Sequence, residues 1–221
     1  MGISTWAAVD DYLDGKLLGA DPVQHETLRH NAASALPAID VSALQGKMLN
    51  LLARMCGARS ILEIGTLGGY STIWLARALP TDGRLVTLEF DPHHAQTARE
   101  NIARAGFSAQ VELRVSAAAE TLPVLAEEGA GPFDFIFIDA DKPSNPIYLD
   151  WAVRLSRPGS VVVLDNVVRD GGVLDAQSPD PRIQGTRAGF DLLAADPRFD
   201  ATAVQTVGAK GYDGFVLAII R

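Results

Sequence analysis

Cysteine is nearly absent from this chain of 221 residues, which contains Cys56 alone. One cysteine cannot form an intrachain disulfide or a cysteine zinc cluster. Long apolar runs are missing too, since no segment approaches the roughly 18 apolar residues that a membrane span needs. The first residues, MGISTWAAVDDYLDGK, carry acids where a secretory signal has basic and then apolar residues. We therefore predict a soluble, cytoplasmic protein.

Positive charge is also scarce. Lysine and arginine number 19 against 27 aspartates and glutamates, which gives a net charge of −8. A protein that holds nucleic acid or an anionic membrane surface by charge needs the opposite balance, so we predict neither as a partner. Two catalytic signatures are missing as well. The sequence has no G-x-S-x-G elbow, so a hydrolase with such a nucleophile elbow is unsupported. No Walker lysine follows the glycine loop, which excludes a P-loop.

The overall composition is that of a folded protein, with 48% apolar and 21% charged residues. We predict one domain, in which residues 1–58 form a helical segment that packs on a core of residues 59–221. Apolar residues between Val41 and Met55 recur at helical spacing, and Pro22 and Pro37 divide this region. From residue 60 onward, short apolar runs alternate with helical segments. This pattern is typical of a parallel sheet with helices on both faces.

Five of these runs are the predicted strands of a doubly wound α/β sheet: Ser60–Ile64, Arg84–Glu89, Gln110–Val115, Phe133–Asp139 and Ser160–Asp165. Two further β-rich runs, Ala201–Val207 and Phe215–Ile220, are joined by GAKGYDG, which leaves no room for a helix. They predict an antiparallel hairpin at the end of the chain. The predicted fold is thus a mostly parallel, seven-stranded, doubly wound sheet with a C-terminal antiparallel hairpin.

A glycine-rich turn follows the first predicted strand in the segment ILEIGTLGGYS. Gly65, Gly68 and Gly69 stand between a strand and a helix, where small residues let the backbone approach a ligand. Glu63 occupies the position at which the dinucleotide fingerprint has its first glycine. A carboxylate there repels a pyrophosphate but suits a cationic ligand such as S-adenosylmethionine, which has a sulfonium and an ammonium group. The alternative is a plain strand–turn–helix corner.

A second acid, Glu89, ends the next predicted strand twenty residues after Gly69. In nucleotide-binding α/β domains an acid at this place binds the ribose hydroxyls, and it would repel the 2′-phosphate of NADP. The other interpretation is a solvated acid at the end of a strand. Asp91 is better explained as the cap of the helix that follows. An NAD-dependent oxidoreductase stays open as an alternative function, although Glu63 argues against it.

Polar residues end the fourth and fifth predicted strands. Asp139 closes the run FDFIFID, and Asp165 and Asn166 close SVVVLDN. If the strand order is 3-2-1-4-5, these side chains stand next to one another beside the glycine loop. Carboxylate and amide oxygens suit Mg²⁺, Mn²⁺ or Ca²⁺ better than zinc, and a dication relieves the repulsion between two carboxylates. The alternative is two unrelated acids that cap the turns after their strands.

Lys142 lies three residues after Asp139 and is a candidate catalytic base. In a cleft beside a metal the charged ammonium is disfavoured, so the amine can accept a proton. Its alternative role is that of a surface lysine or a charge partner of Asp141. By contrast, His93 and His94 lack the spacing of metal ligands and are interpreted as part of a solvated helix face.

Together these segments resemble the cation-dependent O-methyltransferases of the catechol and caffeoyl-CoA type, especially their bacterial members. The resemblance extends from about Val9 to the C-terminus and is carried by QGKMLNLL, LEIGTLGGYSTIWLA, LVTLEFD, FIDADK, LDNVVRDGGV and KGYDGF. It implies the Rossmann-like class I methyltransferase fold and a metal-dependent transfer of methyl from S-adenosylmethionine to a hydroxyl of a catechol-like, vicinal dihydroxy aromatic. It also implies a homodimer. A non-catalytic S-adenosylmethionine-binding module is a further alternative.

The resemblance also implies roles for individual residues. The predicted metal ligands are Asp139, Asp165 and Asn166, and the predicted catalytic residues are Asp139 and Lys142, with Lys142 as the base. Cofactor contacts are implied for Val41, Ser42, Glu63, Gly65, Ser71, Glu89, Ala118, Asp139, Asp141 and Tyr148. Among these, Val41 and Ser42 belong to the segment that closes over the methionine, whereas Glu89 meets the ribose and Ala118 the adenine.

Two departures from the family pattern touch the predicted acceptor pocket. Many relatives continue the D-A-D-K run with x-N-Y, whereas this chain reads DADKPSNP and retains only the later Tyr148. Plant enzymes have tryptophan after D-N-x-x, where this chain has Arg169. The segment Val167–Gly189 is rich in Gly, Asp, Arg and Pro and is predicted to form the acceptor-side loop. The resemblance therefore implies the class of the methyl acceptor and not its identity.

Overall fold

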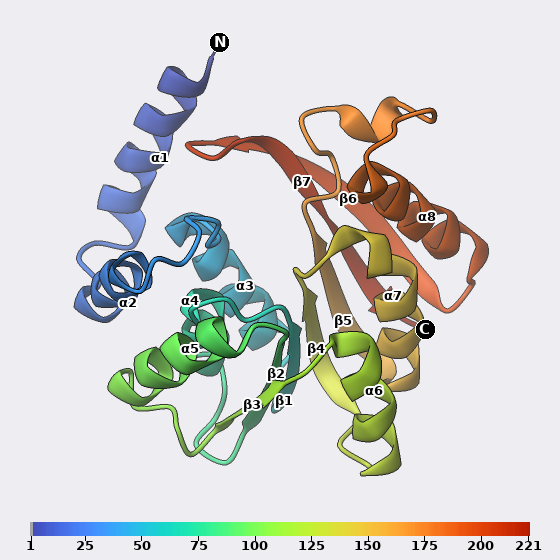
Figure 1. The fold of residues 1–221 in the computed structure, drawn as a ribbon, viewed down its shortest axis with the longest axis horizontal. Helices are drawn as coiled ribbons and strands as arrows, with labels where there is room; N and C mark the ends of the chain where they lie inside the picture. Colours follow the sequence, from blue (N-terminus) through green and yellow to red (C-terminus); the bar gives the residue numbers. More distant parts are fainter. Residues whose placement is uncertain (1) are drawn as a thin grey trace.

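Residues 2–221, described here from a computed structural model, form a central sheet with helices on both faces (Figure 1). The sheet has seven strands in the order β3-β2-β1-β4-β5-β7-β6. The strands are β1 (Ser60–Ile64), β2 (Arg84–Glu89), β3 (Val111–Val115), β4 (Phe133–Ile138), β5 (Ser156–Asp165), β6 (Phe199–Gly208) and β7 (Gly211–Ile220). Strands β1 to β5 pair in parallel, whereas β7 is antiparallel to β5 and β6. The predicted fold class is confirmed.

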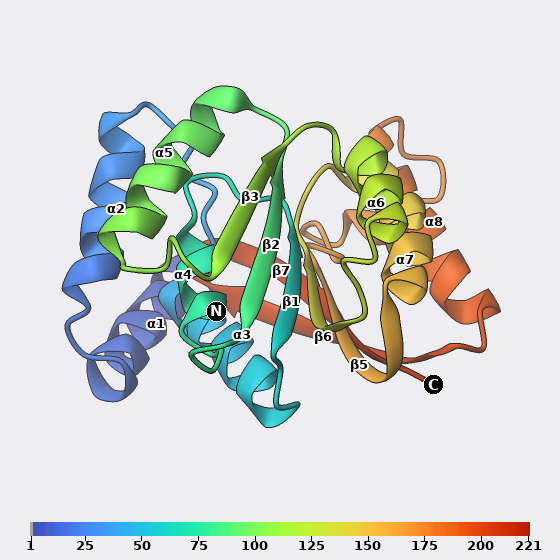
Figure 2. The ribbon, with the colours of Figure 1, turned by 90° about the horizontal axis from the view of Figure 1, so that it is seen from below.

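The helices within residues 2–221 are α1 (Ile3–Leu17), α2 (Pro22–Ala33), α3 (Ala43–Met55), α4 (Tyr70–Ala76), α5 (Pro92–Arg104), α6 (Ala118–Glu127), α7 (Asn145–Arg154) and α8 (Pro181–Ala195). Two 3₁₀ turns, η1 (Lys142–Ser144) and η2 (Gly172–Leu174), follow β4 and β5. Helices α3, α4 and α5 lie on one side of the sheet, and α6, α7 and α8 lie on the other (Figure 2).

Both faces of the parallel strands are apolar because helices bury both. Strand β1 is buried at every position. Its Leu62 and Ile64 join the core under α6 and α7, whereas Ile61 joins the core under α3 and α4. Three helices begin with Asp-Pro: the capping carboxylate accepts a backbone N–H at the start of α2, α5 and α8. These local signals explain why the sequence pattern predicts the elements.

The C-terminal hairpin is longer than the sequence predicts. Strands β6 and β7 remain paired as far as Gly208 and Gly211, so that Ala209 and Lys210 alone form the turn. Gly211 has a φ angle of +104°, which a residue with a Cβ rarely adopts. Strand β5 also begins earlier than predicted, at Ser156, which pairs with Phe133. The tight hairpin turn brings Lys210 to the carboxyl-end edge of the sheet.

Helix α1 lies at the edge of the molecule beside the tip of the β6–β7 hairpin (Figure 1). None of its residues is buried. The Asp10 carboxylate accepts a hydrogen bond from the backbone N–H of Ala209 at 2.8 Å and thereby attaches α1 to the hairpin turn. Over residues 2–221, the structure has no helix with the length and apolar character of a membrane span.

Candidate active site

A cavity of about 1210 Å³ opens at the carboxyl ends of the parallel strands. Its wall includes the glycine loop after β1, Glu89 at the end of β2, the segment after β4 and Asn166 after β5. Residues 38–40, between α2 and α3, and the β6–β7 turn complete the wall. Since ligand pockets usually measure about 300–1,000 Å³, this volume suffices for a nucleoside-sized molecule together with a second, smaller one.

The glycine loop is fixed against the end of β4. Gly65 has a φ angle of +101°, and a Cβ atom at this position would lie 2.2 Å from the backbone oxygen of Asp139. Leu67 also adopts a positive φ, +50°. The backbone N–H groups of Thr66 and Leu67 donate to Oε2 of Glu89 at 3.2 and 2.7 Å. The loop therefore holds a strained conformation in direct contact with both the end of β2 and the end of β4.

Glu89 lies on the cavity wall, at the place where the ribose of the cofactor is predicted to bind. Its Oε1 accepts a hydrogen bond from the backbone N–H of Asp91 at 3.0 Å, and Nδ1 of His94 lies 3.5 Å from the same oxygen. His94 also lines the cavity, so the interpretation of this residue as part of a solvated face is wrong. His93 is exposed, as expected. Asp91 caps α5, which places His94 in the first turn beside Glu89.

Glu63 does not line the cavity, in contrast to the predicted contact with a cationic cofactor. Its side chain is fully buried. The carboxylate accepts hydrogen bonds from Ser71 Oγ at 2.6 Å, Thr72 Oγ1 at 2.5 Å and Thr87 Oγ1 at 2.7 Å. Burial raises the pKa of this carboxyl from 4.5 to about 7, against the opposite effect of the three hydroxyls. Glu63 thus acts through Ser71, which it holds on the cavity wall.

The burial of Glu63 predicts a pH-dependent stability. Its pKa is higher in the folded than in the unfolded state, so the folded state binds more protons between pH 4.5 and about 7. The free energy of unfolding should consequently fall as the pH rises through this range. Glu63→Gln removes this titration and should flatten the curve, whereas Glu127→Gln, at an exposed position, should not. Chemical denaturation at several pH values measures the slope, and equal slopes in both variants would contradict the expectation.

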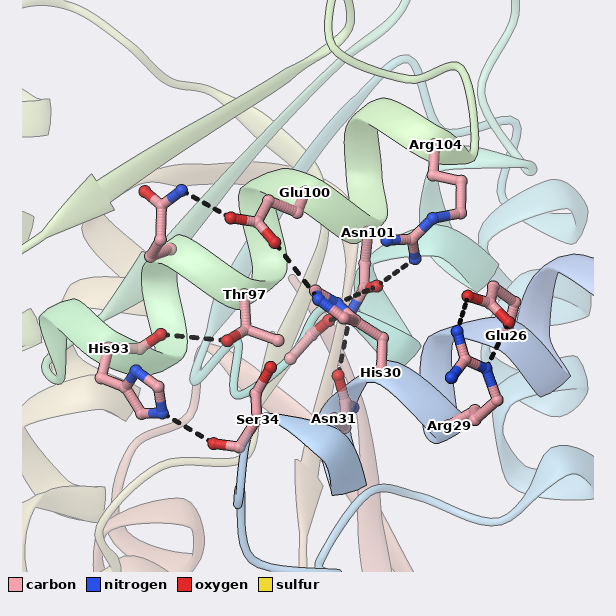
Figure 3. Close-up of polar contacts among 12 residues, drawn as sticks. Glu26, Arg29, His30, Asn31, Ser34, His93, Thr97, Glu100, Asn101 and Arg104 are labelled. Atoms are coloured by element: carbon pink, nitrogen blue, oxygen red, sulfur yellow. Dashed lines mark hydrogen bonds and ion pairs between the residues drawn. The ribbon is translucent and has the colours of Figure 1, made fainter.

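A buried polar network joins the glycine loop to α2 and α5 (Figure 3). Nδ2 of Asn101 donates to the backbone oxygen of Gly68 and to Oδ1 of Asn31, both at 2.8 Å. Nδ2 of Asn31 donates in turn to Oδ1 of Asp40 at 2.9 Å. A Cβ atom on Gly68 would lie 2.0 Å from Oδ1 of Asn31, which explains this second glycine. The network therefore connects the glycine loop with Asp40, which also lines the cavity.

The predicted oxygen ligands lie at the ends of the neighbouring strands β4 and β5. Asp165 is buried; its Oδ2 accepts from Nε2 of Gln45 at 2.6 Å and its Oδ1 from the backbone N–H of Asn166 at 2.8 Å. Oδ1 of Asp139 lies 2.8 Å from Nζ of Lys142. Burial, followed by the charge of Asp139, raises the pKa of the Asp165 carboxyl to about 7. Two mutually repelling carboxylates thus lie near each other, of which Asp139 lines the cavity and Asp165 is buried outside its wall.

This donor set fits a hard divalent cation. Within residues 2–221 no cluster of three His, Cys, Asp or Glu side chains could hold a metal ion, and the predicted set instead combines two carboxylates with the amide of Asn166. Oxygen-only donors are those that Mg²⁺, Mn²⁺ and Ca²⁺ prefer. Burial, and then the charge of Asp139, disfavour the charged form of Asp165 and so raise its pKa, and a nearby dication would favour that charged form. Asn166 adopts a φ angle of +56°, which asparagine tolerates well, and it lines the cavity.

Asp141 and Tyr148 also lie on the cavity wall. The Tyr148 hydroxyl donates to one carboxylate oxygen of Asp141, and Ser144 Oγ donates to the other at 2.6 Å. Burial and the bond to Asp141 raise the pKa of the Tyr148 hydroxyl above its ordinary value. Tyr148 therefore remains a neutral donor that orients the Asp141 carboxylate.

The remaining predicted cofactor residues divide into two groups. Ala118, at the start of α6, lines the cavity beside Ser116 and Ala117. Val41 and Ser42 do not line it: Val41 is buried, and Ser42 caps α3 by accepting from a backbone N–H at 3.2 Å. Their neighbours at positions 38–40 line the cavity instead. Residues 38–40 of this segment therefore lie on the cavity wall, whereas Val41 and Ser42 lie outside it.

Two residues that the sequence analysis does not single out position the catalytic end. Gln45 of α3 holds the carboxylate of Asp165 through the 2.6 Å hydrogen bond. A Cβ atom on Gly185 would lie 2.2 Å from the backbone oxygen of Lys142, so this glycine lets α8 pack directly on η1. As a result the Lys142 side chain is almost fully buried. Gln45 opens the QGKMLNLL motif and Gly185 lies in the segment Val167–Gly189, but neither carried a predicted role.

The strand order, the glycine loop with Glu89 beside it and the oxygen donors after β4 and β5 define a class I methyltransferase. Comparison with known families agrees with this class. A family model described as O-methyltransferase matches residues 19–219, and the chain belongs to this family. The prediction of an S-adenosylmethionine-dependent O-methyltransferase is thereby confirmed, and an NAD-dependent oxidoreductase is no longer an alternative.

Individual relatives are similar over the whole chain. The sequence is 52% identical to the catechol O-methyltransferase of Niastella koreensis over 221 residues, which cover all of both chains. It is 53% identical to the catechol O-methyltransferase of Mycobacterium tuberculosis over 213 residues, or 96% of this chain and 95% of the relative. The crystal structure of an O-methyltransferase from Bacillus cereus in complex with SAH superposes with a TM-score of 0.98, at 56% identity, covering 99% of this chain and 100% of that one.

Proposed function

We propose that the protein transfers the methyl group of S-adenosylmethionine to a hydroxyl of a catechol-like aromatic acceptor and that it uses Mg²⁺, or a similar hard cation such as Mn²⁺ or Ca²⁺. The observation that carries the proposal is that a single cavity joins Glu89 and the glycine loop to Asp139, Lys142 and Asn166. A methyl donor and an oxygen acceptor can thus lie side by side. The names of the two similar catechol O-methyltransferases support the class of acceptor.

The cofactor end of the cavity is formed by groups suited to a nucleoside with an amino acid tail. Glu89 accepts hydrogen bonds from the ribose hydroxyls, and Ala118 lies beside the adenine. Asp141, oriented by Tyr148, supplies the negative charge that attracts the ammonium group of the methionine part. Ser71, held by Glu63, offers a further hydroxyl. These residues bind and orient the methyl donor and take no part in the proton transfer.

At the acceptor end, Asp139, Asp165 and Asn166 would hold the divalent cation. Such a cation, when bound, lowers the pKa of a hydroxyl that coordinates it. Lys142, in its neutral form, would accept the proton of this hydroxyl at Nζ, beside Asp139. Burial of Lys142 under α8 keeps the amine in place, and the cavity wall keeps the acceptor oxygen close to the methyl group. Positioning and electrostatics, rather than covalent catalysis, therefore account for the rate.

An acceptor panel tests the proposal. We expect catechol to be methylated and guaiacol, its monomethyl ether, to be nearly inert, because only two free adjacent hydroxyls can chelate a cation. A chelator should abolish turnover of catechol, and Mg²⁺ or Mn²⁺ should restore it. Product formation by mass spectrometry is the measurement. Full activity of the chelated enzyme on catechol would refute the metal, equal rates on both acceptors would refute chelation, and no turnover of any phenol would favour the non-catalytic binding module.

A substitution tests the proposed base. Lys142→Met keeps the length of the side chain and should lower kcat by about 10²–10⁴-fold, the usual contribution of a positioned acid or base. The loss should shrink at high pH, where the acceptor hydroxyl ionises without help. The affinity for S-adenosylhomocysteine should stay within about threefold, a difference of less than 1 kcal/mol. A variant with normal turnover at every pH would show that Lys142 only pairs with Asp139.

The partners of the protein are proposed from the same resemblance. A small catechol-like substrate is the expected ligand, and we retain the prediction of a homodimer in the cytoplasm without nucleic acid or membrane as a partner. Helix α1 supports the homodimer, since it leaves Ile3, Val9 and Tyr12 exposed on a helix with no buried residue. A second copy of the chain could cover these side chains.

A further inference from the structure

Three cationic side chains line the cavity outside the residues to which cofactor or metal roles are assigned. They are Arg169 after β5, Arg182 in the first turn of α8 and Lys210 in the β6–β7 turn. Arg182 and Lys210 are exposed, whereas Arg169 is partly buried. Arg169 lies three residues from Asn166, so this group of charges belongs to the acceptor end of the cavity.

Two of these cations already have partners. Nη2 of Arg182 lies 2.6 Å from Oδ2 of Asp180, and its Nε donates to the same carboxylate at 3.0 Å. This pair holds the pKa of Asp180 at about 2. Nζ of Lys210 donates to the backbone oxygen of Asp40. Arg169 differs from both. Within residues 2–221 only its backbone atoms form hydrogen bonds, and its guanidinium has no ion-pair partner.

The backbone around Arg169 is held in a conformation that is unfavourable for residues with a Cβ atom. Arg169 and Asp170 have φ angles of +56° and +53°, and Gly171 follows at +82°. Oδ1 of Asp213 accepts the backbone N–H groups of Val168 and Arg169 at 2.9 and 3.0 Å. The Asp213 carboxylate of β7 thus fixes the backbone at Arg169, which lines the cavity.

We infer that Arg169 binds an anionic substituent of the methyl acceptor, so that catechols with a ring-attached carboxylate are the preferred acceptors. The inference rests on the proposed catechol O-methyltransferase activity and adds the charge of the acceptor to it. A guanidinium presents a planar fork of donors that matches a carboxylate, and partial burial strengthens such a pair. Three acids could compete, but Asp139 is bound by Lys142 and Asp141 by Tyr148, and Asp180, which lies within electrostatic range of Arg169, is paired with Arg182.

The test compares 3,4-dihydroxybenzoate with its uncharged methyl ester. Wild-type enzyme should have the higher kcat/KM on the acid. Arg169→Gln should lower kcat/KM on the acid by about 10- to 100-fold, the range expected for a lost charge-assisted hydrogen bond, and on the ester by less than about threefold. Lys210→Gln removes another cation of the cavity wall, whose Nζ already donates to the backbone oxygen of Asp40, and should leave the acid-to-ester ratio unchanged. Calorimetric titration of both compounds into enzyme saturated with S-adenosylhomocysteine should show the same change in relative affinity.

Each remaining outcome argues against a defined part of the inference. Equal losses on acid and ester in Arg169→Gln would make Arg169 a purely structural residue. Loss of the preference in Lys210→Gln alone would transfer the role to Lys210. If wild-type enzyme methylates catechol and the ester without preferring the acid, the inference fails while the proposed function stands. If it methylates none of the three, the proposed function fails and the inference falls with it.

Discussion

Asp165→Ala is expected to lower methyl transfer to a catechol by about a thousandfold or more, while the variant still folds and still binds S-adenosylhomocysteine. A cation that polarises the reacting hydroxyl stabilises the transition state by several kcal/mol, and each kcal/mol changes the rate about fivefold. Asp165 is one of only two carboxylates in the proposed ligand set. Without it the site keeps Asp139 and Asn166, which offer too few protein donors for tight binding of Mg²⁺.

The fold should tolerate this loss because Asp165 is placed unfavourably when no cation is bound. Burial and the charge of Asp139 raise its pKa to about 7, so its charge is costly at and above neutral pH. Removal of the carboxylate relieves this cost but leaves Nε2 of Gln45 without an acceptor, which costs about 1–3 kcal/mol. Since the two effects oppose each other, we expect only a small change in Tm for the metal-free protein.

Two measurements separate catalysis from folding in this variant. S-Adenosylhomocysteine at a hundredfold excess over its Kd should stabilise both wild type and Asp165→Ala by about 2.7 kcal/mol. Asp200→Ala removes an exposed acid of β6 and should retain full activity. Normal turnover of Asp165→Ala would exclude Asp165 from the reaction. Loss of the stabilisation by S-adenosylhomocysteine would instead place Asp165 in the cofactor site.

Gly65→Ala is expected to abolish cofactor binding and to destabilise the protein by more than about 3 kcal/mol. The new Cβ atom would lie 2.2 Å from the backbone oxygen of Asp139, and backbone cannot move aside as a flexible side chain can. The φ angle of +101° adds a conformational cost of its own. Displacement of the loop would also separate Thr66 and Leu67 from Glu89, and so disrupt the predicted ribose site.

Gly159→Ala is the matched control for this substitution. Gly159 has a φ angle of +89°, close to that of Gly65, but a Cβ atom there would meet nothing within 4 Å. Its substitution should therefore report the conformational cost alone, about 1–2 kcal/mol, with cofactor binding and activity retained. Thermal unfolding with and without S-adenosylhomocysteine compares the two variants. Equal destabilisation by both, with cofactor binding intact, would show that the loop does not need its contact with Asp139.

The fold could largely be predicted because its signals are local. Strand β1 is a short apolar run between polar ends, and Asp91-Pro92 marks the start of α5 in two adjacent residues. The length of the hairpin could not be predicted in this way. Gly211 reads as part of a loop in the sequence, whereas in the structure its positive φ allows a turn of two residues.

The sequence prediction places Glu89, Asp139 and Asn166 at the ends of strands, and in the structure all three line one cavity. Glu63 shows the limit of this reasoning. Its place in the motif suggested a ligand contact, but the strand position turns the carboxylate into the core, where three hydroxyls satisfy it. Gln45 belongs to the QGKMLNLL motif, but its contact with Asp165 could not be predicted because that partner is 120 positions away.

The contact of Gly185 with Lys142 also limits how this enzyme can be re-engineered. A design that grafts the acceptor-side loop of a relative between Asn166 and α8 would change the length of the segment that leads into this helix. An altered length would rotate α8 and bring a residue with a side chain against the backbone oxygen of Lys142, where a Cβ atom has only 2.2 Å. Grafts that preserve the nineteen-residue spacing from Asn166 to Gly185 (185 − 166) should keep Lys142, the proposed base, in place. A change in the proposed acceptor-side loop is therefore expected to alter the position of Lys142 as well, because α8 follows that loop and contacts Lys142.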